Sequence, residues 1–446
     1  MRLRRKWRLR LFFEGIFIGI IIGIIIAAFR FLIDEADIYR PLYFETLKTD
    51  NLSMWLLTFS IVIIIAYMLA AFIKLDSQIA GSGVPQIKGI LQGRLIMTRP
   101  LRLLIMKFII SVTSIGAGMS LGRAGLSVQF GACIGNIFNK LFGRFNLHKS
   151  NDYAIESKYL LTAGAGAGLA AVFNAPLAGT IFCVEELNKR FTPELLVISM
   201  TAAVSSSAVV ELVFGIKPVF ETITPTFKNA PVLTDLSINF IINLIILGLF
   251  TGVLGSIFTK MLIFSLDIYD KINIKGIKRF LIPMILIIPI GLTLPKILGC
   301  GNLLVDELLS SNFELNLLII LFLAKFLFTM ICFGTGAPGG IFMPLLILGA
   351  LSGNIFANLF VTMNIFTSDW ISMFIIFAMT GYFAAVVKSP ITGSVLIMEL
   401  TGTFSHLLAL IIVSGVAFLT SDLCGGKPVY SALLERSLNH KINYSR

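Results

Sequence analysis

Charged residues are scarce in this sequence: Asp, Glu, Lys and Arg together make up 13% of its 446 residues. A soluble globular chain carries about 25%. Apolar side chains make up 57% of the chain, and its mean hydropathy is +0.91. The low charge excludes an ordinary soluble enzyme of this size, and the high hydropathy excludes a disordered chain. The composition therefore predicts a protein of the cell membrane that crosses the bilayer many times.

Residues that hold metals or form disulfides are also few. The three histidines are far apart in the sequence and near no carboxylate cluster, which argues against a metal site and against a cofactor. The five cysteines form no CxxC pair and lie mostly in apolar runs, so we expect small buried hydrophobic side chains. The residues concerned are His148, His406 and His440, and Cys133, Cys183, Cys300, Cys332 and Cys424. An intramembrane enzyme would need a nucleophile with a base, or a metal set, and is disfavoured.

Basic residues exceed acidic ones by 36 to 24, a net charge of +12. In a soluble protein this excess could indicate a nucleic-acid partner, but here it is concentrated at the chain start and in connecting segments, as the positive-inside rule describes. Segment 1–10 has six basic residues before the apolar run 11–33, which is too long for a signal peptide. We expect segment 1–10 and the tail 435–446 to be cytoplasmic, with no nucleic-acid partner.

Apolar stretches recur along the whole chain, and a spanning helix needs about 20 apolar residues. The stretches are 11–33, 54–73, 101–119, 159–187, 195–215, 238–266, 279–299, 315–333, 341–362, 372–400 and 406–421. Several are interrupted by glycine and proline. Irregular backbone inside a bilayer must be buried in protein or line an aqueous cavity. We therefore predict one all-α membrane domain over 11–434.

The sequence contains an internal repeat. Residues 170–179 read AAVFNAPLAG and residues 384–393 read AAVVKSPITG. The match aligns Pro176 with Pro390 and Glu185 with Glu399, an offset of 214 residues. Duplicated halves are typical of transporters whose repeats meet around a substrate site near the bilayer midplane. The repeats are expected at about 11–215 and 230–434; a helix-packing motif used twice is the alternative.

Four short segments place glycine, proline and small polar residues where a spanning helix should be apolar. They are 81–85 (GSGVP), 122–125 (GRAG), 339–344 (GGIFMP) and 425–430 (GGKPVY). Proline in the first turn marks a helix start, so the first and third segments predict a loop followed by a helix N-terminus. Such termini offer free N–H groups and a partial positive charge, which suit a small anion. The alternatives are flexible loops and, for Tyr430, a tyrosine at the membrane interface.

These segments together resemble the CLC family of chloride channels and proton-coupled chloride exchangers. The resemblance rests on GSGVPQIKG at 81–89, GRAGLSVQ at 122–129, FNAPLAG…EEL at 173–187, GGIFMP at 339–344 and GGKPVYSAL at 425–433. It covers about residues 11–434 and is to the short prokaryotic members, which have no CBS-type domains. It implies an all-α fold of two inverted-topology repeats with partly broken helices, and a homodimer with one pathway in each subunit.

The resemblance also implies the site residues. Chloride and other small anions would be bound by the hydroxyls of Ser82 and Tyr430 and by the backbone N–H groups of Ile341 and Phe342. Serine at position 82, where nitrate-selective relatives carry proline, favours chloride. The pathway would be lined by Gly81, Gly83, Pro85, Gly122, Arg123, Gly125 and Gly340.

The sequence departs from the family pattern at one decisive position. The family segment normally reads GREGP, and its glutamate is the outer gate and proton carrier. Here the segment reads GRAGL, with Ala124 at the gate position. Glu186 matches the inner glutamate of exchangers, or is only a buried carboxylate without its outer partner. Glu185 and Glu399, the pair related by the repeat, are expected to be structural.

The expected function is therefore passive chloride transport that is uncoupled from protons, because Ala124 can neither block the path nor carry a proton. The alternative is proton/chloride exchange with another carboxylate as the gate. Segment 111–135 contains no Asp or Glu, so that carboxylate would have to come from another helix. A purely structural membrane scaffold would not explain the four glycine- and proline-containing segments.

Overall fold

A computed structural model describes residues 2–49, 52–142, 150–216, 219–220, 238–311, 313–365, 367–402, 404 and 406–444, with the side chains of 2–6, 142, 150–154, 368 and 440–444 left out. Within these ranges every regular element is a helix, as the composition predicts, and one isolated β-bridge joins Gly122 to Gly340. The predictions for His148 and for the side chain of His440 concern groups outside the described residues, and the end of the tail after residue 444 also lies outside them.

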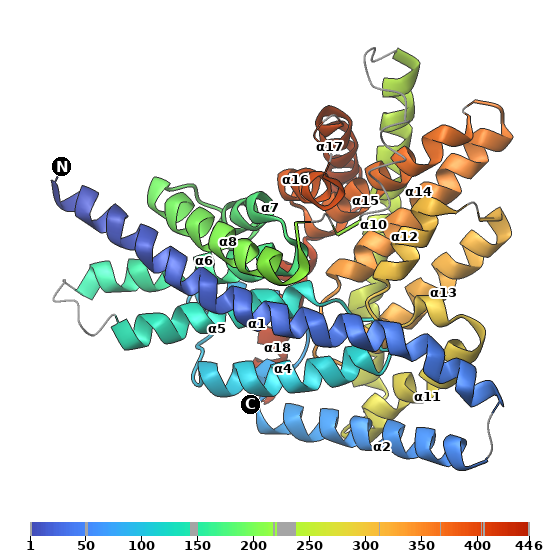
Figure 1. The fold of residues 1–446 in the computed structure, drawn as a ribbon, viewed down its shortest axis with the longest axis horizontal. Coiled ribbons are helices and arrows are strands. Elements are labelled where there is room, and N and C mark those ends of the chain that lie inside the picture. Colours follow the sequence, from blue (N-terminus) through green and yellow to red (C-terminus); the bar gives the residue numbers. More distant parts are fainter. Residues whose placement is uncertain are drawn as a thin grey trace.

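The helices of the first half of the chain surround the first two glycine-containing segments. They are α1 (Arg2–Thr49), α2 (Leu52–Leu75), η1 (Ser77–Ile79), α3 (Val84–Leu91), α4 (Pro100–Gly116), α5 (Ala124–Phe142), α6 (Ser150–Phe173), α7 (Pro176–Phe182), η3 (Cys183–Asn188) and α8 (Pro193–Phe214). The long helix α1 packs along α8 and also contacts α4 (Figure 1).

The second half has a comparable series of helices. They are α10 (Ile238–Lys271), α11 (Ile277–Thr293), η4 (Pro295–Ile297), α12 (Asn302–Ser310), α13 (Leu315–Gly334), α14 (Phe342–Thr362), η5 (Ser368–Trp370), α15 (Ile371–Val387), α16 (Pro390–Thr401), α17 (Leu407–Leu423) and α18 (Val429–Tyr444). Helix α15 packs between α14 and α17 and is buried along its whole length.

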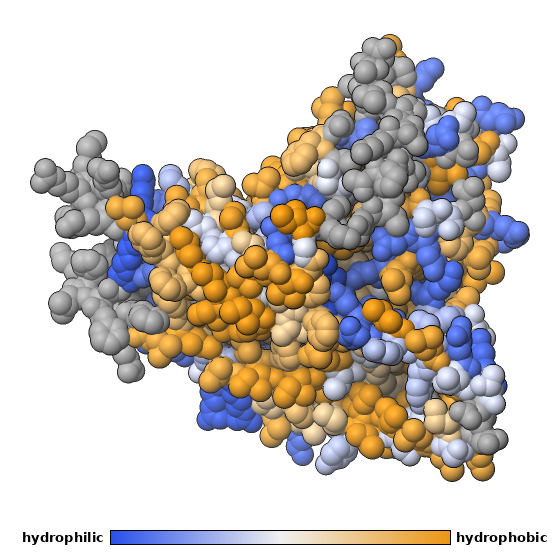
Figure 2. Space-filling model, in the orientation of Figure 1, coloured by the Kyte–Doolittle hydropathy of each residue, from blue (hydrophilic) through white to orange (hydrophobic). Residues whose placement is uncertain are grey.

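Six of the described helices are long and apolar enough to cross a membrane: α1, α2, α8, α10, α13 and α14. Only 22% of the most apolar window of α2 is buried, because the rest faces outward. The face in Figure 2 is correspondingly covered by hydrophobic side chains over much of α1, α2 and α8. An outward apolar surface of this extent suits lipid, so the structure supports the membrane assignment.

Several helix boundaries differ from those expected. The apolar run 11–33 is part of the 48-residue helix α1, which also includes most of the basic segment 1–10. The tail 435–446 begins inside α18, which extends to Tyr444. Stretches 159–187 and 372–400 each break before a proline, at Pro176 and Pro390, because proline lacks the N–H that a continuing helix needs. Cys424 is exposed at the end of α17, unlike the four buried cysteines.

The two carboxylates related by the repeat hold the two halves together. Glu399 accepts hydrogen bonds from the backbone N–H groups of Leu177 (2.9 Å) and Ala178 (2.7 Å) at the start of α7. Glu185 accepts them from Ile391 (3.1 Å) and Thr392 (2.7 Å) at the start of α16. Each carboxylate thus caps the helix of the opposite half, where the helix dipole favours negative charge.

Candidate functional site

All four glycine- and proline-containing segments lead into helix N-termini. Helix α3 begins at Val84 behind Gly83, α5 at Ala124, α14 at Phe342 behind Ile341, and α18 at Val429. Gly83 has a φ of 97°, a conformation that a residue with a side chain rarely adopts. The sequence prediction of helix starts at the first and third segments is confirmed, and the other two segments behave alike.

Three of these segments are joined by backbone hydrogen bonds. Gly122 and Gly340 exchange two of them, with N···O distances of 2.6 and 2.7 Å. The N–H of Gly81 donates to the carbonyl of Gly336 at 3.1 Å, and the carbonyl of Gly81 accepts from the N–H of Gly339 at 3.3 Å. The breaks before α3, α5 and α14 therefore meet at one place, although they are far apart in the sequence.

Ser82 lies directly against the first turn of α5. A side chain at Gly125 would collide with the hydroxyl and the carbonyl oxygen of Ser82, so only glycine fits there. Ser82 is 2% exposed, and its hydroxyl has no hydrogen-bond partner among the described residues. Burying a hydroxyl without a hydrogen-bond partner costs free energy unless a ligand supplies that partner.

Tyr430 presents a second buried hydroxyl of this kind. It lies in the first turn of α18, is completely buried, and its hydroxyl has no partner in the described part of the chain. Helix α18 packs against α3, the helix that follows Ser82. Phe342, at the start of α14, is buried between the rings of Phe383 (4.7 Å between centroids) and Phe173 (5.0 Å).

The segment around Ala124 contains no carboxylate of its own. Ala124 is completely buried at the start of α5, and Arg123 beside it is 1% exposed. The guanidinium of Arg123 donates to Asp34 of α1 at 2.6 Å. Asp34 is thus an acidic residue that another helix contributes here, and nothing in the sequence near position 124 pointed to it.

Glu186 lies in η3, a short π-helical segment, and is 1% exposed. Its carboxylate accepts a hydrogen bond from the ammonium of Lys88 at 2.6 Å and one from the hydroxyl of Ser389 at 3.2 Å. Sequence analysis missed Lys88. Its presence inside an apolar segment was a usable indication, since ionisable groups within a membrane are rare and mostly functional.

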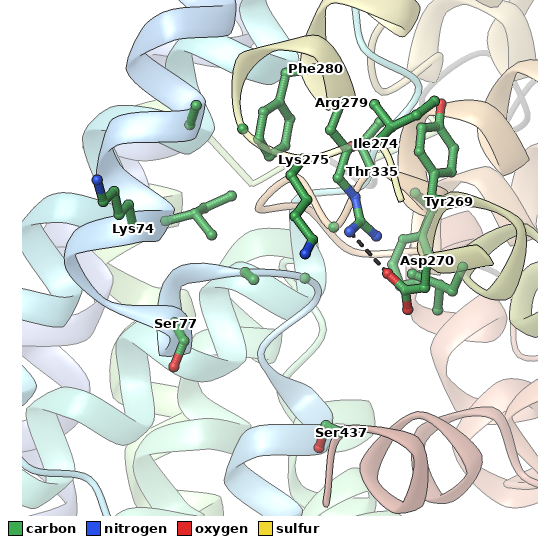
Figure 3. Close-up of a pocket in the computed structure, with 18 of the residues that line it drawn as sticks. Lys74, Ser77, Tyr269, Asp270, Ile274, Lys275, Arg279, Phe280, Thr335 and Ser437 are labelled. Atoms are coloured by element: carbon green, nitrogen blue, oxygen red, sulfur yellow. Dashed lines mark hydrogen bonds and ion pairs between the residues drawn. The ribbon is translucent and has the colours of Figure 1, made fainter. Parts of the chain in front are cut away.

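A cavity of about 1110 Å³ leads to Ser82 and is lined by Gly81, Ser82 and Pro85. Basic side chains dominate its charged lining, as the lining residues Lys74, Lys275, Arg279 and Arg436 show. In Figure 3, Lys275 points into the cavity and Arg279 pairs with Asp270, 3.0 Å away. The cavity therefore provides a basic entrance to the buried hydroxyl of Ser82, suited to a small anion.

The arrangement offers neutral donors, namely the hydroxyls of Ser82 and Tyr430 and the N–H groups of helix N-termini. Such a site can bind an anion without trapping it, as conduction requires. The structure brings several of the predicted site residues together, and Pro85 lies in the first turn of α3: they are Gly81, Ser82, Gly83, Gly122, Arg123, Gly125 and Gly340. For Tyr430, the structure shows that its helix packs against α3.

Comparison with known proteins gives consistent matches. The family model described as "voltage gated chloride channel" matches residues 61–422. An H⁺/Cl⁻ exchange transporter from Vibrio cholerae is 35% identical over 403 residues, covering 87% of this chain and 81% of the relative.

Solved structures match over nearly the full length. A slow cyanobacterial Cl⁻/H⁺ antiporter superposes with a TM-score of 0.85 and 28% identity, covering 96% of this chain and 98% of the other. A eukaryotic CLC transporter superposes with a TM-score of 0.78 and 20% identity, covering 96% and 74%, and shares the fold.

Proposed function

We propose, since this chain belongs to the voltage-gated chloride channel family of membrane anion transporters, that it carries chloride through the site around Ser82 and Tyr430. The observation that carries this proposal is the pair of buried hydroxyls without partners. Chloride accepts hydrogen bonds and donates none, so it would supply the missing acceptor for both hydroxyls. The N–H groups of Ile341 and Phe342 at the start of α14 would add the partial charge of a helix terminus.

The path that we propose begins in the basic cavity and reaches Ser82. Lysine and arginine side chains around the cavity raise the local concentration of anions. At the buried site, hydroxyl and amide donors replace the water around the ion. Serine at position 82 supports a preference for chloride over nitrate, a preference that rests on the family resemblance.

Of the two modes of transport, passive flux and proton-coupled exchange, the comparisons favour exchange. The Vibrio cholerae relative is named an H⁺/Cl⁻ exchange transporter, and the cyanobacterial structure is described as a Cl⁻/H⁺ antiporter. In this chain, exchange requires a proton-carrying carboxylate other than residue 124. Asp34 beside Arg123 and Glu186 beside Lys88 are two carboxylates that the described structure pairs with residues of the site.

Passive, proton-uncoupled flux is the second candidate, and Ala124 is the observation that favours it. Alanine has no charge and no titratable proton, so position 124 can neither close the path electrostatically nor deliver a proton. Asp34 and Glu186 are each engaged in an ion pair of 2.6 Å with a basic side chain, so neither carboxylate is free to swing into position 124 without breaking that pair.

The deciding experiment records chloride efflux and external pH together from liposomes containing the purified protein, with the membrane potential set by valinomycin. Stoichiometric proton uptake during chloride efflux establishes exchange, and chloride efflux without proton movement establishes passive flux. If exchange is found, Asp34→Asn and Glu186→Gln identify the carrier, because the variant that lacks it retains chloride flux and loses proton movement. A protein that moves neither ion refutes the proposal.

We also propose that the protein is a homodimer in the plasma membrane, with one pathway per subunit and both termini in the cytoplasm. These points rest on the family resemblance and on the basic residues of segment 1–10. Single-molecule subunit counting in liposomes tests the dimer. Modification of cysteines introduced near each end by an impermeant reagent tests the orientation, and labelling from the outer side would refute it.

The two repeats are proposed at about 11–215 and 230–434. The reciprocal capping by Glu185 and Glu399 supports this division, because each carboxylate has the same role in the opposite half. Co-expression of two fragments divided between 215 and 230 tests it: assembly into an active transporter supports the boundary, and failure of every such division contradicts it.

A further inference from the structure

Lys88 and Glu186 form a buried ion pair between two separate segments of the chain. The ammonium of Lys88 and the carboxylate of Glu186 are 2.6 Å apart, and each side chain is 2% exposed. The second carboxylate oxygen accepts a hydrogen bond from Ser389, which lies at the start of α16. A charge pair this deeply buried interacts strongly with any ion nearby, because little water screens it.

The pair lies beside the proposed chloride site. Lys88 is in the second turn of α3, the helix that begins immediately after Ser82 and Gly83. The segment η3, which contains Glu186, and the helix α18, which begins with Val429 and Tyr430, both pack against α3. An anion bound between Ser82 and Tyr430 would therefore be repelled by the carboxylate of Glu186 if that charge were not balanced.

We propose that Lys88 sets the electrostatic potential of the anion site by neutralising Glu186, and so determines chloride affinity. This inference rests on the proposed function of the Ser82–Tyr430 site. A second lysine in this region, Lys189, lies at the end of η3. Lys88 is the partner in direct contact, and it is the more buried of the two lysines.

A purely structural ion pair makes a different prediction. If the pair only holds α3 against η3, removing either partner leaves one buried charge uncompensated. Both removals then lower the stability of the protein, and both shift its chloride affinity in the same direction. If the pair sets the potential, the two removals act oppositely on chloride. Loss of Lys88 leaves a negative charge that repels the anion, and loss of the charge on Glu186 leaves a positive charge that attracts it.

The test measures chloride binding by titration calorimetry on purified full-length protein in detergent, with isethionate as the other anion. The variants are Lys88→Met, Glu186→Gln and the double variant. We expect Lys88→Met to bind chloride about tenfold more weakly, the size of effect that close charge pairs reach, and Glu186→Gln to bind it more tightly. The double variant should lie within about twofold of the original protein, because its pair again has no net charge.

Lys296→Met is the matched control, because Lys296 forms an ion pair of the same length with Glu307 at an exposed site. It should leave chloride binding unchanged. If Lys88→Met fails to fold, Glu186→Gln alone decides: tighter binding supports the proposal, and weaker or equal binding overturns it. If both single variants shift affinity in the same direction, the pair is structural. If the original protein binds no chloride, the proposed function itself fails.

Discussion

Removal of the Tyr430 hydroxyl should stabilise the chloride-free protein and weaken its binding of chloride. The substitution Tyr430→Phe deletes one oxygen and keeps the ring, which is completely buried in the first turn of α18. That oxygen has no hydrogen-bond partner among the described residues. A buried polar group without a partner costs about 1–3 kcal/mol, so without chloride its removal should raise the free energy of unfolding by about 1 kcal/mol.

The effect on chloride should have the opposite sign. A hydrogen bond to a charged group contributes about 1.5–3 kcal/mol. At 1.4 kcal/mol for each factor of ten, the dissociation constant for chloride should rise by about 10- to 150-fold. Thermal unfolding in a chloride-free buffer measures the first effect, and titration calorimetry with chloride measures the second.

Tyr382→Phe provides the control, because Tyr382 of α15 is also completely buried and its hydroxyl also has no partner in the described structure. It should raise stability in the same way and leave chloride binding unchanged. Chloride binding of normal strength in Tyr430→Phe would refute the role of this hydroxyl as a ligand. Equal losses of chloride affinity in both variants would show that the effect is not specific to the site.

Three further predictions concern the gate position, the entrance and the junction between the halves. Ala124→Glu should slow chloride flux in liposomes at neutral pH and restore it as pH falls, because an ionised carboxylate blocks the path and a protonated one does not; pH-independent flux would contradict the assigned position. Lys275→Glu should lower flux several-fold at low ionic strength and less at high, because surface charges are screened over about 10 Å at 0.1 M salt; Lys278→Glu, outside the cavity lining, is the control. Glu185→Gln should lower the free energy of unfolding by about 0.5–2 kcal/mol, measured by thermal unfolding, because the charged cap of α16 is lost. Glu399→Gln should have the same effect on α7. No change in the stability of either variant would refute the capping role.

The sequence predicted the fold class because membrane burial has a strong compositional signature. Runs of apolar residues located most of the helices, and glycine with proline located the helix starts at Gly83–Pro85 and Ile341–Pro344. Helix lengths were harder to predict. Helix α1 extends from Arg2 to Thr49, well beyond the apolar run 11–33 from which it was predicted. Packing against α8 and α4 supports the helix beyond that run.

The candidate site was predicted in its parts and not in its electrostatics. Ser82, Gly122 and Gly340 stood out because small residues inside an apolar run are conspicuous. Their proximity could not be read from the chain, since it depends on hydrogen bonds between segments more than 200 residues apart. Asp34 was missed for the same reason: it is 89 positions from Arg123 in the chain.

The sequence by itself determined that this protein lies in a membrane, that its helices break at four glycine- and proline-containing segments, and that position 124 has no carboxylate. These properties depend on residue type and local spacing. Only the tertiary structure decided which charges face one another: Lys88 with Glu186, Arg123 with Asp34, and Glu185 and Glu399 with the opposite helix termini. The reason is physical, because the strength of a charge interaction depends on distance and burial, and folding fixes both.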